Sequence, residues 1–532
     1  MTSASSTGFP ILSVLIFSPL LAVAVLLLLR SERAQRWWTF GFTTAAALFS
    51  LLLLRDFDAD THAFQFTEKV AWIPTLKIDY ALGIDGISLL LVLLTTLITP
   101  LCVLASWNYI QKRVKEFMVG LLLMETTMLG VFCALDTILF FVFWEAMLIP
   151  MALLIGIWGG PRRVYAALKF FIYTMAGSVF LLVALIALRL KTGSFDLVGT
   201  MGQPFSSGFQ AWVFAAFFVS FAIKVPMFPF HTWLPAAHVE APTAGSVLLA
   251  SVLLKMGTYG FLRFALPITP DAVHAFGPAI MWISVAAILY GGFAALAQSD
   301  LKKLVAYSSV SHMGFATLGI FALNAGGLEG ATLVMINHGI TTGGLFMVVG
   351  LIYERLHTRD LAAAAGIGKH MPVFAFCYGV FCLSSLAFPG TNSFVGEFLV
   401  LAGGFKVSTL LVVCAVPGIV AAAAYNLRML QKLAYGDAKN PVHRHLADLN
   451  FREMAMFAPL IVFVFWIGLN PRPIIRLMHA SVTHVVQQAS VPRDQIASAS
   501  RTATTRTIAE YGPDARAASP TTTATPVPLT RP

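Results

Sequence analysis

The stretch 211–245, AWVFAAFFVSFAIKVPMFPFHTWLPAAHVEAPTAG, decides the fold because it buries a lysine in a hydrophobic run and then breaks that run. Lys224 follows Ala211 at a separation that corresponds to about 20 Å along a helix with a rise of 1.5 Å per residue. Pro226 and Pro229 come directly after it. Proline removes a backbone hydrogen bond and clashes with the preceding turn. The stretch therefore predicts a helix that is interrupted just after a deeply placed charge.

The composition of the whole chain indicates that this charge lies in lipid. The chain has 532 residues, of which 58% are hydrophobic and 11% charged, and its mean hydropathy is +0.80. Soluble globular proteins carry about 25% charged residues, so a water-facing surface cannot be built from this composition. A β-barrel would require short alternating strands, which the sequence lacks. We predict an all-α integral membrane protein, because helices satisfy their own backbone groups in lipid.

Apolar runs of the roughly 20 residues that a spanning helix needs recur along the chain. We predict about fourteen such helices. The first run, from about Phe9 to Leu29, is too long for a signal-peptide core and follows no basic residue, so we interpret it as helix one. The runs centre near Ala22, Ala46, Val92, Leu122, Phe143, Phe180, Phe217, Leu254, Val285, Thr317, Thr341, Leu383, Val420 and Ile461.

The charges in the loops predict the orientation of the helices. Basic residues follow helices one, three and five, whereas the loop after helix two is acidic. Because basic loops face the cytoplasm, both termini are expected on the outer side of the membrane. The net charge of +10 therefore reflects topology and not nucleic-acid binding. The basic residues are Arg30, Arg33, Arg36, Lys112, Arg113, Lys115, Arg162 and Arg163, and the acidic ones are Asp56, Asp58, Asp60, Glu68 and Asp79.

Ionisable residues in five other runs lie at a depth similar to that of Lys224. A charge at the bilayer centre costs about 2.5 to 3.5 kcal/mol on insertion scales, and such residues mark ion paths and proton relays. A carboxylate beside a buried lysine holds the lysine's proton, and moving the carboxylate away releases it. We therefore predict a proton relay at the membrane midplane, formed by Glu145, Lys224, Lys255, His312, His338 and Glu397. Glu125 and Asp136 are predicted nearer helix ends, outside this relay.

A second break, at Pro389 and Gly390, precedes Glu397. Each break falls in the fourth helix of a five-helix unit, and an odd number of helices inverts the second unit relative to the first. Matched broken helices in inverted repeats indicate a transporter's ion path. The predicted organisation is helices one to three in 1–115, repeats in 116–268 (helices four to eight) and 269–436 (helices nine to thirteen), helix fourteen and its flanks in 437–485, and a disordered polar tail in 486–532.

The five cysteines show no spacing typical of a metal or iron-sulfur site, and no specific nucleotide-binding loop is present. Any redox cofactor is therefore expected on another chain. The cysteines are Cys102, Cys133, Cys377, Cys382 and Cys414.

Four stretches carry a resemblance to a known family: LGIDGISLLLVLLTTLITPLCVLASW (82–107), FHTWLPAAHVEAPTAGSVLLASVLLKMGTYGFLRF (230–264), AQSDLKKLVAYSSVSHMGFATLGIFAL (297–323) and INHGITTGGLFMVVGLIYER (336–355). They resemble the antiporter-like membrane subunits of respiratory complex I, the proton-pumping NADH:quinone oxidoreductase. The similarity is to the branch that contains bacterial chain M and mitochondrial subunit 4. It extends from helix one through helix fourteen and leaves out the tail.

The resemblance implies roles for individual residues. Glu145 and Lys224 match the essential pair, Lys255 the bridging lysine and Glu397 the terminal carboxylate. His312 and His338 match the polar axis between the half-channels. Ala236 replaces an aspartate that many relatives have. A gating or structural role is implied for His231, Trp233, Glu240, Pro226, Pro229 and Pro389.

The resemblance also implies the setting of this activity. Proton translocation would be coupled to electron transfer from NADH to quinone on other subunits, which would hold FMN, the iron-sulfur clusters and quinone. Two sister antiporter-like chains would flank this one in the bilayer. Two alternatives are a subunit of a multisubunit cation/proton antiporter and a subunit of a membrane-bound hydrogenase complex. A structural membrane scaffold explains the midplane charges poorly.

Overall fold

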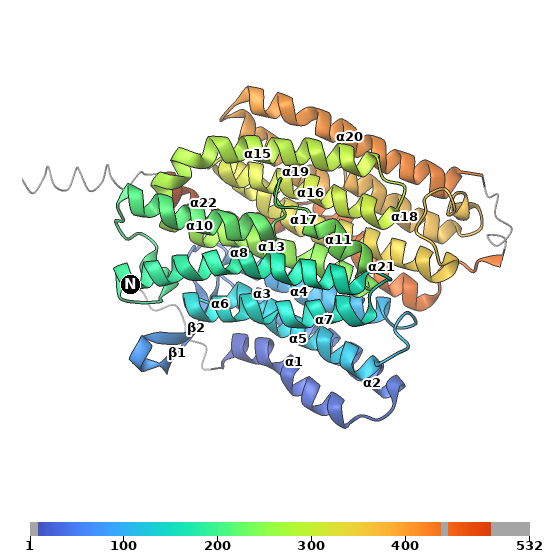
Figure 1. The fold of residues 1–532 in the computed structure, drawn as a ribbon, viewed down its shortest axis with the longest axis horizontal. Helices are drawn as coiled ribbons and strands as arrows, with labels where there is room; N and C mark the ends of the chain where they lie inside the picture. Colours follow the sequence, from blue (N-terminus) through green and yellow to red (C-terminus); the bar gives the residue numbers. More distant parts are fainter. Residues whose placement is uncertain (1–8, 438–444, 491–532) are drawn as a thin grey trace, which may run out of the picture.

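The computed structural model describes residues 9–437 and 445–490. Helices packed side by side form one bundle, with α1 and α2 at one edge and α15 and α20 at the other (Figure 1). Within the described residues, thirteen helices are long and apolar enough to cross a membrane. One further span consists of two shorter apolar helices, α18 and α19, on either side of Pro389. The chain is thus a multi-pass membrane protein, and the prediction of about fourteen spans is confirmed.

The helices of the N-terminal part are α1 (Ile11–Leu28), α2 (Glu32–Ser50), α3 (Leu52–Asp56), α4 (Gly86–Ala105), α5 (Val114–Cys133), α6 (Thr137–Ala146), α7 (Leu148–Trp158), α8 (Arg163–Thr192) and α9 (Leu197–Thr200). The first broken span consists of α10 (Ser207–Lys224) and α11 (Trp233–Glu240). The next span contains two π-helical turns: α12 (Thr243–Leu248), η2 (Leu249–Leu253), α13 (Leu254–Gly260), η3 (Phe261–Ala265) and α14 (Leu266–Ile268).

The remaining helices are α15 (Pro270–Leu296), α16 (Leu301–Phe321), α17 (Ala325–Leu356), η4 (Ile367–Lys369), α18 (Pro372–Ser385), α19 (Asn392–Phe405), α20 (Thr409–Tyr435), α21 (Phe451–Leu469) and α22 (Arg472–Ser490). Both predicted breaks are present, between α10 and α11 and between α18 and α19. The relation of the two five-helix units as inverted repeats stays a prediction.

The two ends of the bundle differ in charge. One end, here called the basic end, carries loops rich in Arg and Lys. These loops are 106–113, 159–162 and 357–371. For example, Trp158 Nε1 donates to the Lys112 carbonyl at 2.8 Å. At the opposite end, here called the hairpin end, Leu135 N donates to the carbonyl of Ala81 at 2.8 Å. The loops therefore alternate between the ends as their charges predict.

A two-stranded hairpin lies within the acidic loop and was not predicted. Strand β1 (Gln65–Ile73) pairs antiparallel with β2 (Ile78–Ile84) around the short helix η1 (Pro74–Leu76). Lys69 Nζ lies 3.0 Å from Asp79 Oδ2 across the pair, and this hydrogen bond raises the pKa of Lys69. The hairpin is fastened to α1 because Glu68 accepts from the backbone of Leu12 at 2.8 Å.

The last helix, α22, is a second unpredicted element. It is amphipathic and buries Ile474, Met478, Val482 and Val485 at helical spacing. It crosses the hairpin end, where Ser481 accepts from Gly86 N at 3.0 Å and His479 pairs with Glu329 at 2.6 Å. It continues to Ser490, and the rest of the predicted tail lies outside the described residues.

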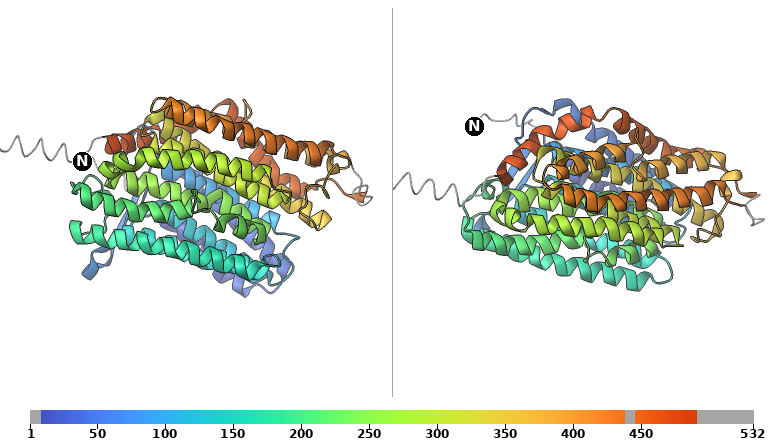
Figure 2. Two further views of the ribbon diagram at one scale, coloured as in Figure 1. Left: turned by 45° about the horizontal axis from the view of Figure 1, so that its top comes forward. Right: turned by 90° about the horizontal axis from the view of Figure 1, so that it is seen from above.

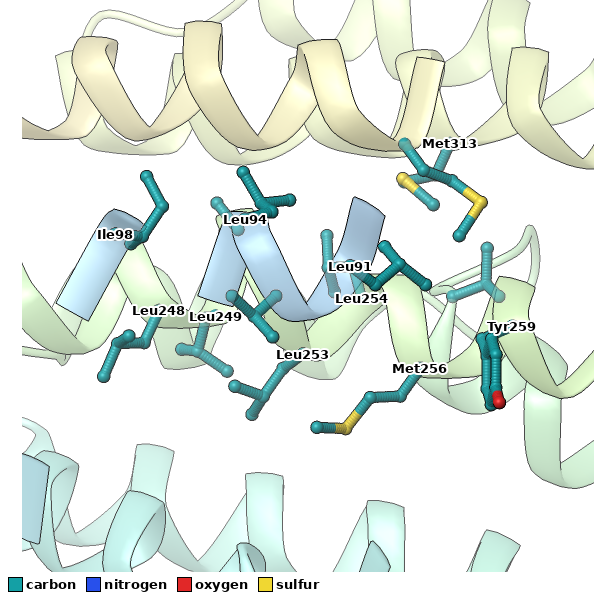
Figure 3. Packing of buried hydrophobic residues seen from close by; sticks show 14 of the residues in the cluster. Leu91, Leu94, Ile98, Leu248, Leu249, Leu253, Leu254, Met256, Tyr259 and Met313 are labelled. Carbon is teal, nitrogen blue, oxygen red and sulfur yellow. The ribbon is translucent and has the colours of Figure 1, made fainter. Parts of the chain in front are cut away.

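The span 243–268 forms the centre of the bundle and is buried along its whole length. The apolar side chains of α4, such as Leu91, Leu94 and Ile98, lie close to Leu249 and Leu254 of this span (Figure 3). Gly343 of α17 permits a close approach, because a Cβ there would lie 2.6 Å from Ser251 Oγ. Because the central span is buried along its whole length, any polar group on it is remote from lipid.

The further views of the bundle show the same side-by-side arrangement of α15 and α20 (Figure 2).

Asp85 and Arg263 form a buried ion pair near the hairpin end. Arg263 Nη2 lies 2.5 Å from Asp85 Oδ1, and the two side chains are only 5% and 3% exposed. Ser88 N donates to the same carboxylate at 3.0 Å, and Arg263 Nε contacts Tyr259 Oη at 3.3 Å. The pair thus joins the start of α4 to η3.

We expect Asp85→Asn to destabilise the protein by about 3 to 5 kcal/mol, because it leaves a buried guanidinium unpaired. The measurement is the thermal midpoint of the purified assembly. Asp60→Asn is the matched control: Asp60 pairs with Arg476 on the surface, where the side chains are 77% and 72% exposed, so we expect a change of about 1 kcal/mol or less. Equal midpoints for the two variants would contradict this role of Asp85.

Candidate functional site

Lys224 is the last residue of α10, directly before the first break. Its side chain is buried, and Nζ has no hydrogen-bond partner among the described residues. Nζ lies 4.8 Å from the centre of the Trp144 ring, a cation–π contact. The break thus leaves the ammonium group at the end of a half-helix within the bundle.

Glu145 lies beside Trp144 on α6 and is half-buried. It is within electrostatic reach of Lys224, but the two do not form an ion pair in this structure, because the Trp144 ring and not the carboxylate contacts Nζ. Ser178 of α8 accepts from Trp144 Nε1 at 3.0 Å and donates to the carbonyl of Thr174 at 3.1 Å. The structure therefore brings Glu145 and Lys224 together at one site without joining them.

Lys255 lies on α13, just after the π-helical turn η2. Its Nζ donates to the carbonyl of Ala250 in that turn and lies 2.7 Å from His338 Nδ1 of α17. Both side chains are buried. Turns of this kind occur frequently at functional sites. Lys255 and His338 thus form one hydrogen-bonded unit across two spans.

His312 and Glu397 form a second unit across α16 and α19. His312 Nδ1 lies 2.9 Å from Glu397 Oε1. The other ring nitrogen, Nε2, is 3.4 Å from both Ser385 Oγ and Tyr425 Oη. The second helix break positions Glu397, since α19 begins at Asn392 beyond Pro389.

The two units face each other across a small cavity. The ring centres of His312 and His338 are 5.8 Å apart. A cavity of about 10 Å³ between them is also lined by Glu397, Thr342 and Ser385, and this volume is near the minimum for one water molecule. Four of the six predicted relay residues therefore lie on one polar line from α13 to α19, with the small cavity between its two hydrogen-bonded units.

Lys224 has no hydrogen bond to this line within the part of the chain that the structure describes. The span carrying Lys255 packs on the end of α10 at Gly257, where a Cβ would lie 2.8 Å from the Phe221 carbonyl oxygen and 2.7 Å from Val225 Cγ2. Gly257 is needed for this approach. The relay thus has two parts, Glu145 with Lys224 and the line from Lys255 to Glu397.

His238 of α11 was not among the predicted relay residues. It is buried, its ring stacks on Phe346 with centres 4.5 Å apart, and neither ring nitrogen has a partner among the described residues. It lies within electrostatic reach of both Lys255 and Lys302. His238 follows the prolines that break the span, so its depth in the membrane cannot be counted in residues from the start of the helix.

The prediction that Glu125 lies near a helix end is wrong. Glu125 is in the middle of α5, fully buried, and both carboxylate oxygens lack a partner among the described residues. The helix begins at Val114, close to the basic loop, so the residue lies deeper than the run suggested. Asp136 is at a helix end, as predicted: it caps α6 and accepts from Ile138 N at 2.8 Å.

The residues predicted to gate or support the site lie in three places: Pro226, Pro229, His231 and Trp233 at or just after the first break, Pro389 at the second break, and Glu240 at the basic end. Trp233 is buried, and its Nε1 donates to the Ile223 carbonyl at 2.8 Å, which satisfies a backbone group at the end of α10. His231 is also buried, with its ring 4.8 Å from that of Tyr290. Glu240 lies at the basic end and accepts from Arg162 N at 2.9 Å. Their positions fit a supporting role around the relay.

Comparison with known proteins places this geometry in a family. Residues 134–422 match the family described as NADH:quinone oxidoreductase/Mrp antiporter, transmembrane, and residues 12–131 match the amino terminus of NADH-ubiquinone oxidoreductase chain 4. The chain is 45% identical to NADH-quinone oxidoreductase subunit M of Rhodobacter capsulatus over 496 residues, which cover 90% of this chain and 96% of the relative. It is 43% identical to NADH-ubiquinone oxidoreductase chain 4 of Marchantia polymorpha over 479 residues, with coverage of 90% and 97%.

A chain of respiratory complex I from Thermus thermophilus has the same fold. Its TM-score is 0.83 at 30% identity, and the match covers 90% of this chain and 99% of that one. Residues 134–422, which match the family model, include all six predicted relay residues. The chain belongs to the NADH:quinone oxidoreductase/Mrp antiporter family, in the branch of subunit M and chain 4.

Proposed function

We propose that this chain translocates protons as a membrane subunit of an NADH:quinone oxidoreductase. The observation that carries the proposal is the polar line through the membrane interior, in which Lys255 bonds His338 and His312 bonds Glu397 around a water-sized cavity. Ionisable groups within a membrane are costly and mark proton paths. The relatives named as subunits of NADH-quinone oxidoreductase support the link to that enzyme.

In this proposal Glu145 and Lys224 form the switch, and the line from Lys255 to Glu397 forms the conductor. Movement of Glu145 toward Lys224 would hold the lysine's proton, and withdrawal would release it toward Lys255. Water entering the contact at Gly257 and Val225 would join the two parts. Proton flow through this chain is thus controlled at its first break.

The same proposal assigns the surroundings of the chain. The basic end faces the cytoplasm of a bacterial cell, which puts both termini on the periplasmic side of the inner membrane. Two sister antiporter-like chains are the expected neighbours. FMN, iron-sulfur clusters and quinone belong to other subunits, and no redox chemistry takes place on this chain.

Purification of the tagged chain from its native membrane tests this function. We expect it to co-purify with flavin and iron-sulfur subunits, and the reconstituted assembly to acidify vesicles when NADH is oxidised. Glu145→Gln should assemble, retain NADH oxidation with an artificial acceptor, and lose most of the acidification. Purification with cation/proton antiporter subunits alone, or full acidification by Glu145→Gln, would contradict the proposal.

A further inference from the structure

Two cavities lie in succession at the basic end of the bundle. The larger, of about 520 Å³, is lined by Glu354, Glu453, Tyr109 and Tyr353. The smaller, of about 30 Å³, is lined by Glu240 and Lys302 and by the same two tyrosines. The ring centres of Tyr109 and Tyr353 are 6.4 Å apart, with the planes tilted by 57°. These two rings therefore form a common wall between the cavities.

The two carboxylates that line the larger cavity differ in their ion pairing. Glu453 is held by Arg355 at 2.8 Å and by Arg452 at 3.3 Å. Glu354 is half-buried and forms no ion pair with any of the described residues. A carboxylate that no cation holds is free to bind a proton from water in the cavity. Glu354 is thus a carboxylate of this cavity that no ion pair with the described residues holds.

The smaller cavity leads toward the relay. Lys302 is buried at one side of it, with Nζ donating to the Ala241 carbonyl. Val239 also lines this cavity, and the preceding residue is His238, whose two ring nitrogens are unpartnered among the described residues. The charges of Lys302 and Lys255 both reach this ring. A volume of about 30 Å³ accommodates at least one water molecule, which would lie between the tyrosines and Val239, the residue that follows His238 in the chain.

We propose that protons reach the relay from the basic end through these two cavities, with Glu354 as the collecting group and Tyr109 and Tyr353 as a gate. This inference rests on the proposed function and adds the inlet and its gate. Glu354 takes a proton from water and passes it to water at the tyrosine wall. His238 accepts one proton on one ring nitrogen and releases one from the other toward Lys255 and His338. This transfer leaves His238 as the other neutral tautomer, and a flip of its ring restores the first tautomer before the next proton arrives. Glu354 and His238 are then in their starting states, so one proton enters the line for each one collected.

The collecting role is tested with Glu354→Gln in inside-out membrane vesicles that contain the whole assembly. We expect the initial rate of NADH-driven acidification to fall about fivefold, the factor that corresponds to one lost charge–proton attraction in water. Glu116→Gln is the matched control, because Glu116 is an exposed carboxylate near the basic end that pairs with Arg113 at 3.2 Å; it should pump at the wild-type rate. NADH oxidation with an artificial acceptor reports whether each variant is assembled.

The gate is tested by thiol labelling from the basic end. The Glu354→Cys variant should react rapidly with a small, charged, membrane-impermeant thiol reagent. Thr243 lines the smaller cavity, and the Thr243→Cys variant should react only when Tyr109→Ala is also present. The parent protein with its five native cysteines gives the background.

Two results would overturn the inference: a wild-type pumping rate in Glu354→Gln, or labelling at position 243 that is unchanged by Tyr109→Ala. If Lys224→Ala stops pumping while Glu354→Gln does not, the relay stands and only the route is refuted. If neither variant changes pumping, the proposed function itself fails.

Discussion

Replacing Lys224 by alanine is expected to abolish most NADH-driven proton pumping. The ammonium group ends the first half-helix, is buried, and lies against Trp144 within reach of Glu145. Loss of a positioned proton-transfer group typically slows transfer by a factor of about 100 or more. The measurement is acidification of proteoliposomes that contain the purified assembly, at a fixed NADH concentration.

The control for this variant is Lys112→Ala, which removes an exposed lysine at the basic end and should leave pumping unchanged. Both variants should oxidise NADH with an artificial acceptor at the normal rate, which shows that the peripheral subunits are attached. Normal pumping by an assembled Lys224→Ala variant would remove Lys224 from the mechanism and favour a structural scaffold.

Replacing Lys255 by alanine should cause an intermediate to severe loss of pumping. The change removes the 2.7 Å contact between Nζ and His338 Nδ1, which begins the polar line. His338→Ala breaks the same contact from the other side. Residues that act as one unit show strongly non-additive effects, so the double variant should pump no more slowly than the worse single variant.

The informative comparison is therefore between the single and double variants in one vesicle preparation. Additive losses would mean that Lys255 and His338 serve separate paths, which contradicts a continuous line. A partial return of pumping in Lys255→Arg would support the requirement for a cation at this position.

The relay residues are predictable because a charged side chain is easily recognised in a run of apolar residues that crosses lipid. A lysine or glutamate within an apolar run is costly, so Lys224, Lys255 and Glu397 stand out in the sequence at once. The prolines that break α10/α11 and α18/α19 are equally visible. The depth of the six predicted relay residues along their runs predicts that they meet near one level, and four of the six, Lys255, His338, His312 and Glu397, do lie on one polar line.

Other features depend on contacts between distant segments and were not predictable in this way. The insertion of Trp144 beside Lys224 is a matter of helix rotation, which composition does not determine. His238 follows a break, where counting from a helix start fails. Glu125 was misplaced because the run around it has no sharp boundary. The hairpin strands are short and α22 is amphipathic, so neither forms a long apolar run in the sequence.

The family resemblance and the structure give different information about Glu145 and Lys224. The resemblance implies which residues form the essential pair, whereas the structure shows that Glu145 and Lys224 are near but not joined. That separation is what a switch requires, since a permanently formed pair would not release its proton. The proposed mechanism therefore depends on motion at the first break.

The most direct test of proton conduction by this chain is a high-resolution structure of the whole assembly in lipid, in which buried waters are located in resting and working states. We predict water between His312 and His338 in both states, and water between Lys224 and Lys255 in at least one. A contact at Gly257 and Val225 that stays closed and dry in every state would contradict the account.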